Sequence, residues 1–182
     1  MGRLYYITGG AGSGKSEYAE TLAERLHTAL AGPLYYVATM HPAPQDSDAA
    51  ARIAKHQHRR ADKGYTTVEC PTDIAKLHAQ PLKDAVILLE DLTNLYANEV
   101  YGTDGHPHAI VAPLLQLAQQ AGALIIVANE LYSDGITYET ETDQFLRALA
   151  DLAAELCMAA DQVTEVVYGI PIQLKGDLCS IH

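Results

Sequence analysis

A glycine-rich segment near the N-terminus constrains this chain more than any other feature. It reads Gly9-Gly10-Ala11-Gly12-Ser13-Gly14-Lys15-Ser16 and fits the phosphate-binding pattern G-x-x-x-x-G-K-[ST]. Residues 4–8 are apolar and aromatic and predict a buried strand, and the spacing of leucine and alanine over residues 16–30 predicts a helix. This strand–loop–helix setting disfavours the alternative of a chance glycine-rich turn. We therefore predict that residues 9–16 hold a nucleoside triphosphate.

The chemistry of such a loop follows from its backbone. Glycines let consecutive N–H groups turn inward onto phosphate oxygens, and the N-terminus of the following helix adds positive potential. Lys15 is predicted to reach the β- and γ-phosphates, and the Ser16 hydroxyl is predicted to bind Mg²⁺. The sequence thus names Mg²⁺ as the expected cofactor.

Composition excludes several other classes of protein. The chain has 182 residues, enough for one domain with a full-sized core, which we expect to span residues 1–182 with a frayed tail at 176–182. A net charge of −11 without a basic run argues against nucleic-acid binding. No apolar run approaches the length of a membrane span, and no secretion signal is recognised. Three scattered cysteines suggest reduced thiols in the cytoplasm.

Apolar runs of strand length alternate with segments of helical spacing along the chain. The predicted strands are residues 4–8, 34–39, 65–69, 85–89, 123–128, 163–168 and 172–174. The predicted helices are residues 16–30, 49–60, 74–77, 92–100, 110–121 and about 145–156, and residues 132–142 are expected to form an exposed loop. Thr72-Asp73 is predicted to cap the helix of residues 74–77. The alternation predicts an α/β fold of the P-loop type, with a mostly parallel sheet covered by helices on both faces.

Ligands of such sheets bind outside the carboxyl ends of the strands. This rule nominates Thr39, Glu90-Asp91 and Asn129-Glu130 as neighbours of the phosphate-binding loop. We predict that Glu90 binds Mg²⁺ together with Ser16, and that Thr39 contacts the nucleotide. A helix N-cap is the alternative role for these carboxylates, and Asp91 suits it because a helix is predicted to begin at Leu92.

A second candidate site lies on the predicted helix of residues 49–60. Asp48, Arg52, His56 and Arg60 are spaced by four and would form one stripe. Two flanking guanidinium groups would keep the histidine neutral and nucleophilic, and they could bind nucleotide phosphates. The alternative is a basic surface helix without a catalytic role, and spacing alone leaves both readings open.

The order of these motifs resembles the bifunctional adenosylcobinamide kinase/adenosylcobinamide-phosphate guanylyltransferase family of cobalamin biosynthesis. The similar segments are Thr8-Gly9-Gly10-Ala11 and Ser13-Gly14-Lys15-Ser16, Ala19-Glu20, Tyr36-Val37-Ala38-Thr39, Arg52-Ile53 with His56 and Arg60, Leu88-Leu89-Glu90 with Thr93 and Asn98, Asn129-Glu130, Ala160-Asp161 and Gly169-Ile170-Pro171. They run in register to about Lys175. The loop alone is unspecific, but its combination with R-I-x-x-H-x-x-x-R is quite specific.

The resemblance implies a RecA-like fold and a two-step enzyme that uses ATP and GTP. A first step would phosphorylate adenosylcobinamide, and a second would pass GMP from GTP to the cobinamide phosphate. By position His56 would be the residue that carries GMP, with Arg52 and Arg60 as phosphate contacts. The partners implied are nucleotide and corrinoid small molecules and further copies of the chain, in a trimer.

Three segments depart from the family pattern. Gly12 stands where the family usually has arginine, residues 131–137 lack the usual V-G-x-G-I-V-P, and residues 145–150 onward lack a Gly and an Asn-Gln pair. These departures keep two alternatives open: another small-molecule P-loop kinase, or a GTP/ATP-binding protein that has lost corrinoid catalysis. No N-K-x-D motif follows residue 128, which disfavours a switching GTPase.

Overall fold

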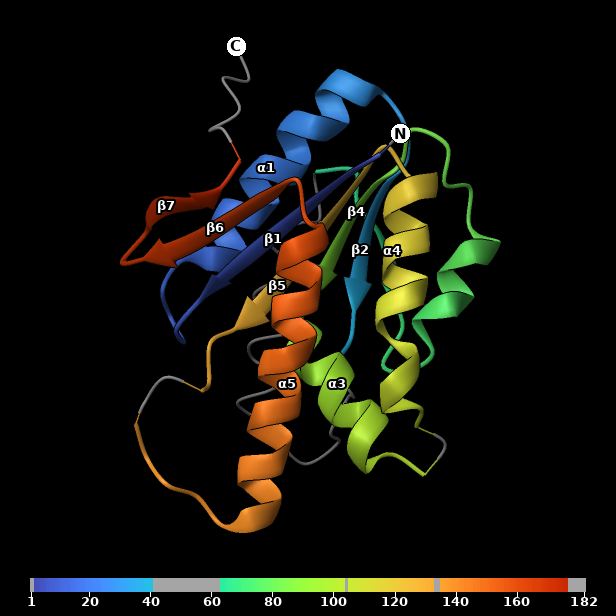
Figure 1. Ribbon diagram of the computed structural model, residues 1–182. Helices are drawn as coiled ribbons and strands as arrows, with labels where there is room; N and C mark the ends of the chain where they lie inside the picture. Colours follow the sequence, from blue (N-terminus) through green and yellow to red (C-terminus); the bar gives the residue numbers. More distant parts are fainter. Residues whose placement is uncertain (1, 41–62, 104, 133–134, 177–182) are drawn as a thin grey trace.

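A seven-stranded sheet forms the centre of the computed structural model, which describes residues 2–40, 63–103, 105–132 and 135–176. The strands are β1 (Arg3–Gly9), β2 (Leu34–Ala38), β3 (Thr66–Glu69), β4 (Val86–Glu90), β5 (Ala123–Asn129), β6 (Gln162–Val167) and β7 (Ile170–Lys175). Their order across the sheet is β3-β2-β4-β5-β1-β6-β7. Every neighbouring pair is parallel except β6 and β7, which form an antiparallel hairpin at one edge (Figure 1).

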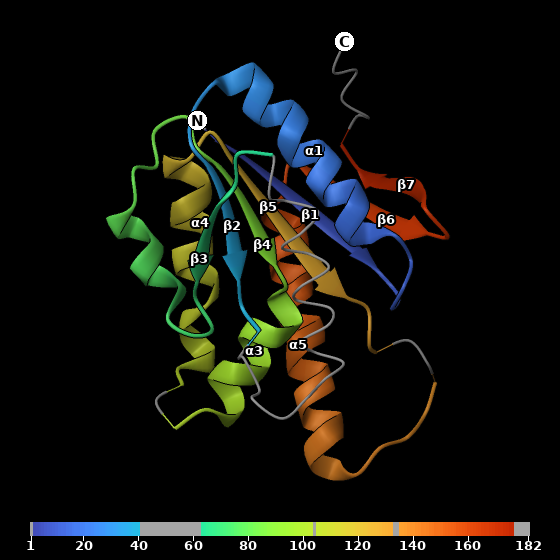
Figure 2. The same cartoon turned by 180° about the vertical axis from the view of Figure 1, so that it is seen from behind.

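Helices cover both faces of this sheet. Helix α1 (Lys15–Leu30) lies on one face, as the view from behind shows (Figure 2). The other face carries α3 (Leu92–Tyr101), α4 (Val111–Gln120) and α5 (Thr140–Ala159), and two 3₁₀ helices, η1 (Ile74–Ala79) and η2 (Pro107–Ala109), lie beside α4 and α3. The central strands β4 and β5 are therefore buried on both sides, which explains their unbroken apolar sequences.

The predicted P-loop fold is confirmed, and so is its mostly parallel sheet of seven strands. The boundaries of three elements were wrong. Residues 74–77 belong to the longer 3₁₀ helix η1, and the Asp73 side chain forms no cap hydrogen bond because its backbone is left-handed at φ 54°. Helix α5 begins at Thr140, inside the expected loop, where Glu141 and Asp143 favour a helix N-terminus. Strand β7 includes Ile170 and Pro171, since an edge strand tolerates a missing donor.

The buried carboxylate of Glu99 on α3 joins two connections of the fold. One oxygen accepts a hydrogen bond from the backbone N–H of Asp73 at 2.6 Å, and the other accepts one from the N–H of His106 at 2.6 Å. Only 4% of Glu99 is exposed. A single side chain thus fixes the segments that precede η1 and η2.

Replacing Glu99 with alanine is expected to lower the free energy of unfolding by about 1–3 kcal/mol, because two backbone donors lose a charged acceptor. Urea denaturation would measure this loss. Glu155→Ala on the exposed side of α5 is the matched control and should change the free energy by less than about 0.5 kcal/mol. Equal effects of the two substitutions would contradict the bridging role of Glu99.

Candidate functional site

The phosphate-binding loop connects the end of β1 to the start of α1 and is packed tightly against the β6–β7 hairpin. The backbone N–H of Gly169 donates to the carbonyl of Ser13 at 2.7 Å. A Cβ atom at Gly9 would lie 2.5 Å from the carbonyl oxygen of Val166, so no larger residue fits there. Gly14 adopts φ 93° immediately before the helix, a conformation that glycine favours. Close packing therefore requires a glycine at position 9, and turn geometry favours one at position 14.

Lys15 and Ser16 form the first turn of α1 and point toward different partners. The Lys15 side chain is 7% exposed and its ammonium donates to the carbonyl of Gly10 at 3.0 Å, so it lies across the loop. The Ser16 hydroxyl donates a hydrogen bond to the Glu90 carboxylate at the end of β4. Two residues that are 74 positions apart in the chain are thereby brought into direct contact.

Glu90 occupies the position expected for a carboxylate that assists magnesium binding. Its second oxygen accepts a hydrogen bond from the Tyr36 hydroxyl on β2 at 3.2 Å. A serine hydroxyl and one carboxylate, completed by phosphate oxygens and water, are the donor set that Mg²⁺ prefers in nucleotide sites. The pair Ser16 and Glu90 fits this cofactor, and no cluster of three metal-ligating side chains occurs within the described residues.

Asp91 is the N-cap of α3 and the centre of a second network. Its carboxylate accepts hydrogen bonds from the backbone N–H of Asn94 at 2.7 Å, from the Asn94 amide at 3.2 Å and from the Asn129 amide at 3.0 Å. Burial raises the pKa of Asp91, with the Glu90 charge adding to the shift, whereas these donors and Lys15 oppose it. The N-cap role, left open by the sequence, is confirmed by this geometry.

Thr39 forms two hydrogen bonds with the backbone of Asp91. Its hydroxyl donates to the carbonyl oxygen of Asp91 at 2.8 Å and accepts from the Asp91 N–H at 2.8 Å. The residue is fully buried, so its contact with nucleotide stays a prediction. Glu130 is tied to the loop through its backbone N–H, which donates to the carbonyl of Gly9 at 3.2 Å.

The three strand ends nominated by the sequence therefore do meet beside the loop. Sequence reasoning assigned no role in the site to Tyr36 or Asn94, because a tyrosine in a buried strand and an asparagine in the first turn of a helix have ordinary structural roles. The histidine stripe with Arg52, His56 and Arg60 falls outside the described residues, so its placement remains a prediction.

Burial of the Lys15 ammonium predicts a pH dependence for nucleotide binding. Burial lowers the pKa of Lys15 below its ordinary value of 10.5, and the carboxylates of Asp91 and Glu90 oppose this shift only in part. Affinity for a triphosphate should therefore fall as the pH rises toward 10.5, since neutral Lys15 no longer attracts phosphate. Over the same range the free energy of unfolding of the nucleotide-free protein should rise, because the unfolded chain binds more protons.

Calorimetric titration with tripolyphosphate from about pH 7 to about pH 10, the range that ends near the pKa of an ordinary lysine, would measure the change in affinity. The control is Lys15→Arg, whose guanidinium stays charged, so its affinity for tripolyphosphate should not decline over this range. A decline of equal slope in both proteins would show that some other group titrates.

The sequence of this chain is similar to those of known proteins over nearly its whole length. A sequence model of the family described as cobinamide kinase/cobinamide phosphate guanyltransferase matches residues 5–174. The chain belongs to this family. It is 30% identical over 188 residues to the bifunctional adenosylcobalamin biosynthesis protein CobU of Escherichia coli, with 94% of this chain and 99% of the relative covered. It is also 30% identical over 177 residues to CobP of Pseudomonas aeruginosa, with 94% and 96% covered.

Solved structures resemble the family fold at much lower identity. The flagellar accessory protein FlaH from Methanocaldococcus jannaschii gives a TM-score of 0.55 at 13% identity, covering 97% of this chain and 79% of that protein. A second solved structure, described as an ATPase domain, gives a TM-score of 0.51 at 12% identity, covering 90% of this chain and 68% of that one. These likenesses concern the fold alone. Within the described part of the chain, no helix has the length and apolar character needed to cross a membrane.

Proposed function

We propose that this member of the family phosphorylates adenosylcobinamide with ATP or GTP and then transfers GMP from GTP to the product, giving adenosylcobinamide-GDP. The observation that carries the proposal is the family match over residues 5–174, which includes the loop and the R-I-x-x-H-x-x-x-R motif. The loop geometry supports the same conclusion, because Lys15, Ser16 and Glu90 converge where a triphosphate would bind. Family resemblance further suggests a homotrimer, and the cysteine pattern a cytoplasmic enzyme.

In the kinase step the residues of the loop hold and neutralise the phosphates. The backbone N–H groups of residues 9–16 would bind the phosphate oxygens, and Lys15 would bridge the β- and γ-phosphates. Ser16 and Glu90 would hold Mg²⁺, which withdraws charge from the phosphate oxygens when bound. The Tyr36 hydroxyl fixes the orientation of Glu90, so this carboxylate is positioned before the ligand arrives.

In the transfer step His56 would act as a covalent carrier. Its neutral ring nitrogen attacks the α-phosphorus of GTP, a P–N bond forms and pyrophosphate leaves with the electrons of the broken P–O bond. An oxygen of the cobinamide phosphate then attacks the same phosphorus and releases the histidine. Arg52 and Arg60 would bind the phosphate oxygens during both displacements.

The products of both steps test the proposal directly. Adenosylcobinamide incubated with protein, ATP and Mg²⁺ should be converted to its phosphate, and subsequent GTP should give adenosylcobinamide-GDP, both followed by liquid chromatography and mass spectrometry. A phosphate product without the GDP product would favour another P-loop kinase. Tight nucleotide binding without any corrinoid product would favour a binding protein that has lost catalysis.

A further inference from the structure

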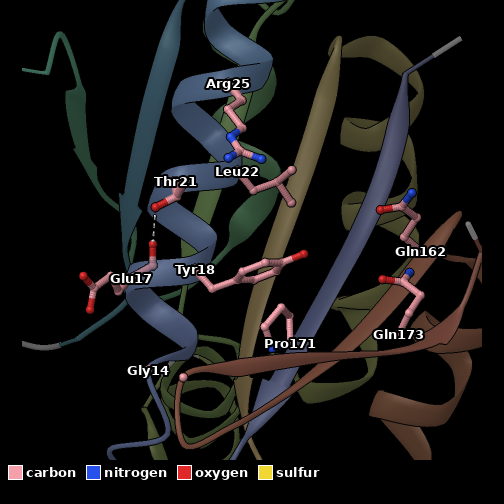
Figure 3. Close-up of a pocket in the computed structure, with 10 residues that line it drawn as sticks. Gly14, Glu17, Tyr18, Thr21, Leu22, Arg25, Gln162, Pro171 and Gln173 are labelled. Carbon is pink, nitrogen blue, oxygen red and sulfur yellow. Dashed lines mark hydrogen bonds between the residues drawn. The ribbon is translucent and has the colours of Figure 1, made fainter. Parts of the chain in front are cut away.

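A groove lies between α1 and the β6–β7 hairpin, beside the phosphate-binding loop. Its volume is about 380 Å³, which falls within the range of small-molecule sites. From α1 it is lined by residues that include Gly14, Tyr18 and Arg25, and from the hairpin by residues that include Gly169, Pro171 and Gln173 (Figure 3). The groove thus begins at the last glycine of the loop and runs along the helix that the loop introduces.

The direction of a bound triphosphate follows from the order of the strands. Ser16 contacts Glu90 at the end of β4, and Lys15 reaches the β- and γ-phosphates, so the γ end of a triphosphate lies toward β4. Strand β1, which carries the loop, has β5 and then β4 on one side and β6 and β7 on the other. The nucleoside must therefore leave the loop on the side of β6 and β7, where the groove opens.

Close packing keeps the groove continuous with the loop. The Gly169 N–H donates to the Ser13 carbonyl, and a Cβ atom at Gly14 would lie 3.2 Å from the Cα atom of Gly169. The hairpin tip is consequently fixed against the loop, and the distance between the phosphate site and the groove cannot vary freely. A ligand that spans both would meet a preformed site.

The side chains in the groove suit a planar, uncharged heterocycle. The Tyr18 ring projects from α1 over Pro171 (Figure 3). Part of the Tyr18 side chain is buried against the core on this face of the sheet. The Gln173 amide is oriented by accepting from the Thr164 hydroxyl at 3.1 Å and donating to the Lys175 carbonyl at 2.6 Å, which leaves one donor and one acceptor position for a ligand. The charged residues that line the groove, Glu17 and Arg25, have opposite signs. Together they favour a ligand group without net charge.

We propose that this groove binds the nucleoside of the triphosphate held by the loop, with the base stacked on Tyr18 and its edge bonded to Gln173. The inference rests on the proposed function, because it takes the loop as the triphosphate site. It adds a site, formed by α1 and the β6–β7 hairpin, that would recognise the base of the nucleotide. The pyrophosphate leaving group of the transfer step would then separate from a nucleotide that is still held by its base.

Substitutions on α1 test the groove without touching the loop. Tyr18→Ala removes the stacking surface, Tyr18→Phe keeps it, and Thr21→Trp places a large side chain in the groove from an exposed position of α1. Dissociation constants for Mg-ATP, Mg-GTP and Mg-tripolyphosphate would be measured by calorimetry, with Thr28→Ala on the same helix as the control. Tripolyphosphate carries the phosphate chain but no nucleoside, so it reports on the loop alone.

Tyr18→Ala and Thr21→Trp are expected to weaken binding of the nucleotides at least about tenfold and to leave tripolyphosphate binding unchanged. Thr28→Ala should bind all three ligands as the unaltered protein does, and Tyr18→Phe should restore most of the nucleotide affinity that Tyr18→Ala loses. Unchanged nucleotide affinity in Thr21→Trp, or an equal loss for tripolyphosphate, would overturn the inference while the loop assignment stands. Nucleotide binding that is insensitive to Lys15→Ala would overturn the loop assignment and this inference together.

Discussion

Replacing His56 with alanine is expected to abolish the covalent label that α-labelled GTP leaves on the protein in the presence of Mg²⁺. A phosphorus–nitrogen bond to histidine is labile in acid and stable in base, so the label on the unaltered protein should show that behaviour. Incubation, denaturation and gel autoradiography after acid or base treatment would measure it. The loss should be complete, because the substitution removes the only group of this residue that can attack phosphorus.

His58→Ala is the matched control for this experiment. His58 lies two positions further along and off the stripe that joins Arg52, His56 and Arg60, so its loss should leave the label intact. Undiminished labelling of His56→Ala would refute the assignment. Labelling lost in His58→Ala but not in His56→Ala would move the carrier role to the neighbouring histidine.

Replacing Lys15 with alanine is expected to lower the kcat/KM of the kinase step by about a hundredfold or more. The ammonium is the only side chain of the loop that brings positive charge to the β- and γ-phosphates, and loss of one such charged donor typically costs this much. The measurement is the initial rate of adenosylcobinamide phosphate formation at several ATP concentrations. Thermal unfolding should show no loss of stability, because the substitution removes a buried charge.

The two substitutions separate the steps when they are compared side by side. His56→Ala should retain the kinase rate and lose GMP transfer, whereas Lys15→Ala should lose the kinase rate. A Lys15→Ala variant with a near-normal kinase rate would show that the loop does not hold the phosphate donor. Loss of both activities in His56→Ala at unchanged nucleotide affinity would place this histidine in a site shared by both steps.

Much of the fold could be predicted because local signals and tertiary structure agree. Apolar runs such as residues 86–90 and 123–129 have no polar face, which requires a sheet covered on both sides. One error occurred where a tertiary contact overrides a local signal. Asp73 resembles a helix cap in sequence, but its N–H is bound by Glu99 and its side chain does not cap η1.

The sequence predicted which strand ends contribute residues to the candidate site, but it did not predict the contacts between those residues. The sequence nominated Glu90 and Asp91 together, since both follow the same buried strand. The structure gives the two carboxylates different partners. Glu90 accepts hydrogen bonds from the Ser16 and Tyr36 hydroxyls. Asp91 accepts hydrogen bonds from Asn94 and Asn129 and caps α3. No spacing rule connects these partners, because they come from four different elements.

The sequence by itself determined a parallel α/β sheet of the P-loop type, because its apolar runs require strands covered on both faces and its glycine pattern at residues 9–16 depends on backbone conformations that few other residues adopt. It also supplied the histidine motif on which the family resemblance depends. Only the tertiary structure decided which carboxylate meets Ser16 and where a groove continues from Gly14. Both depend on the order of strands across the sheet, in which β4 and the β6–β7 hairpin flank the loop from opposite sides.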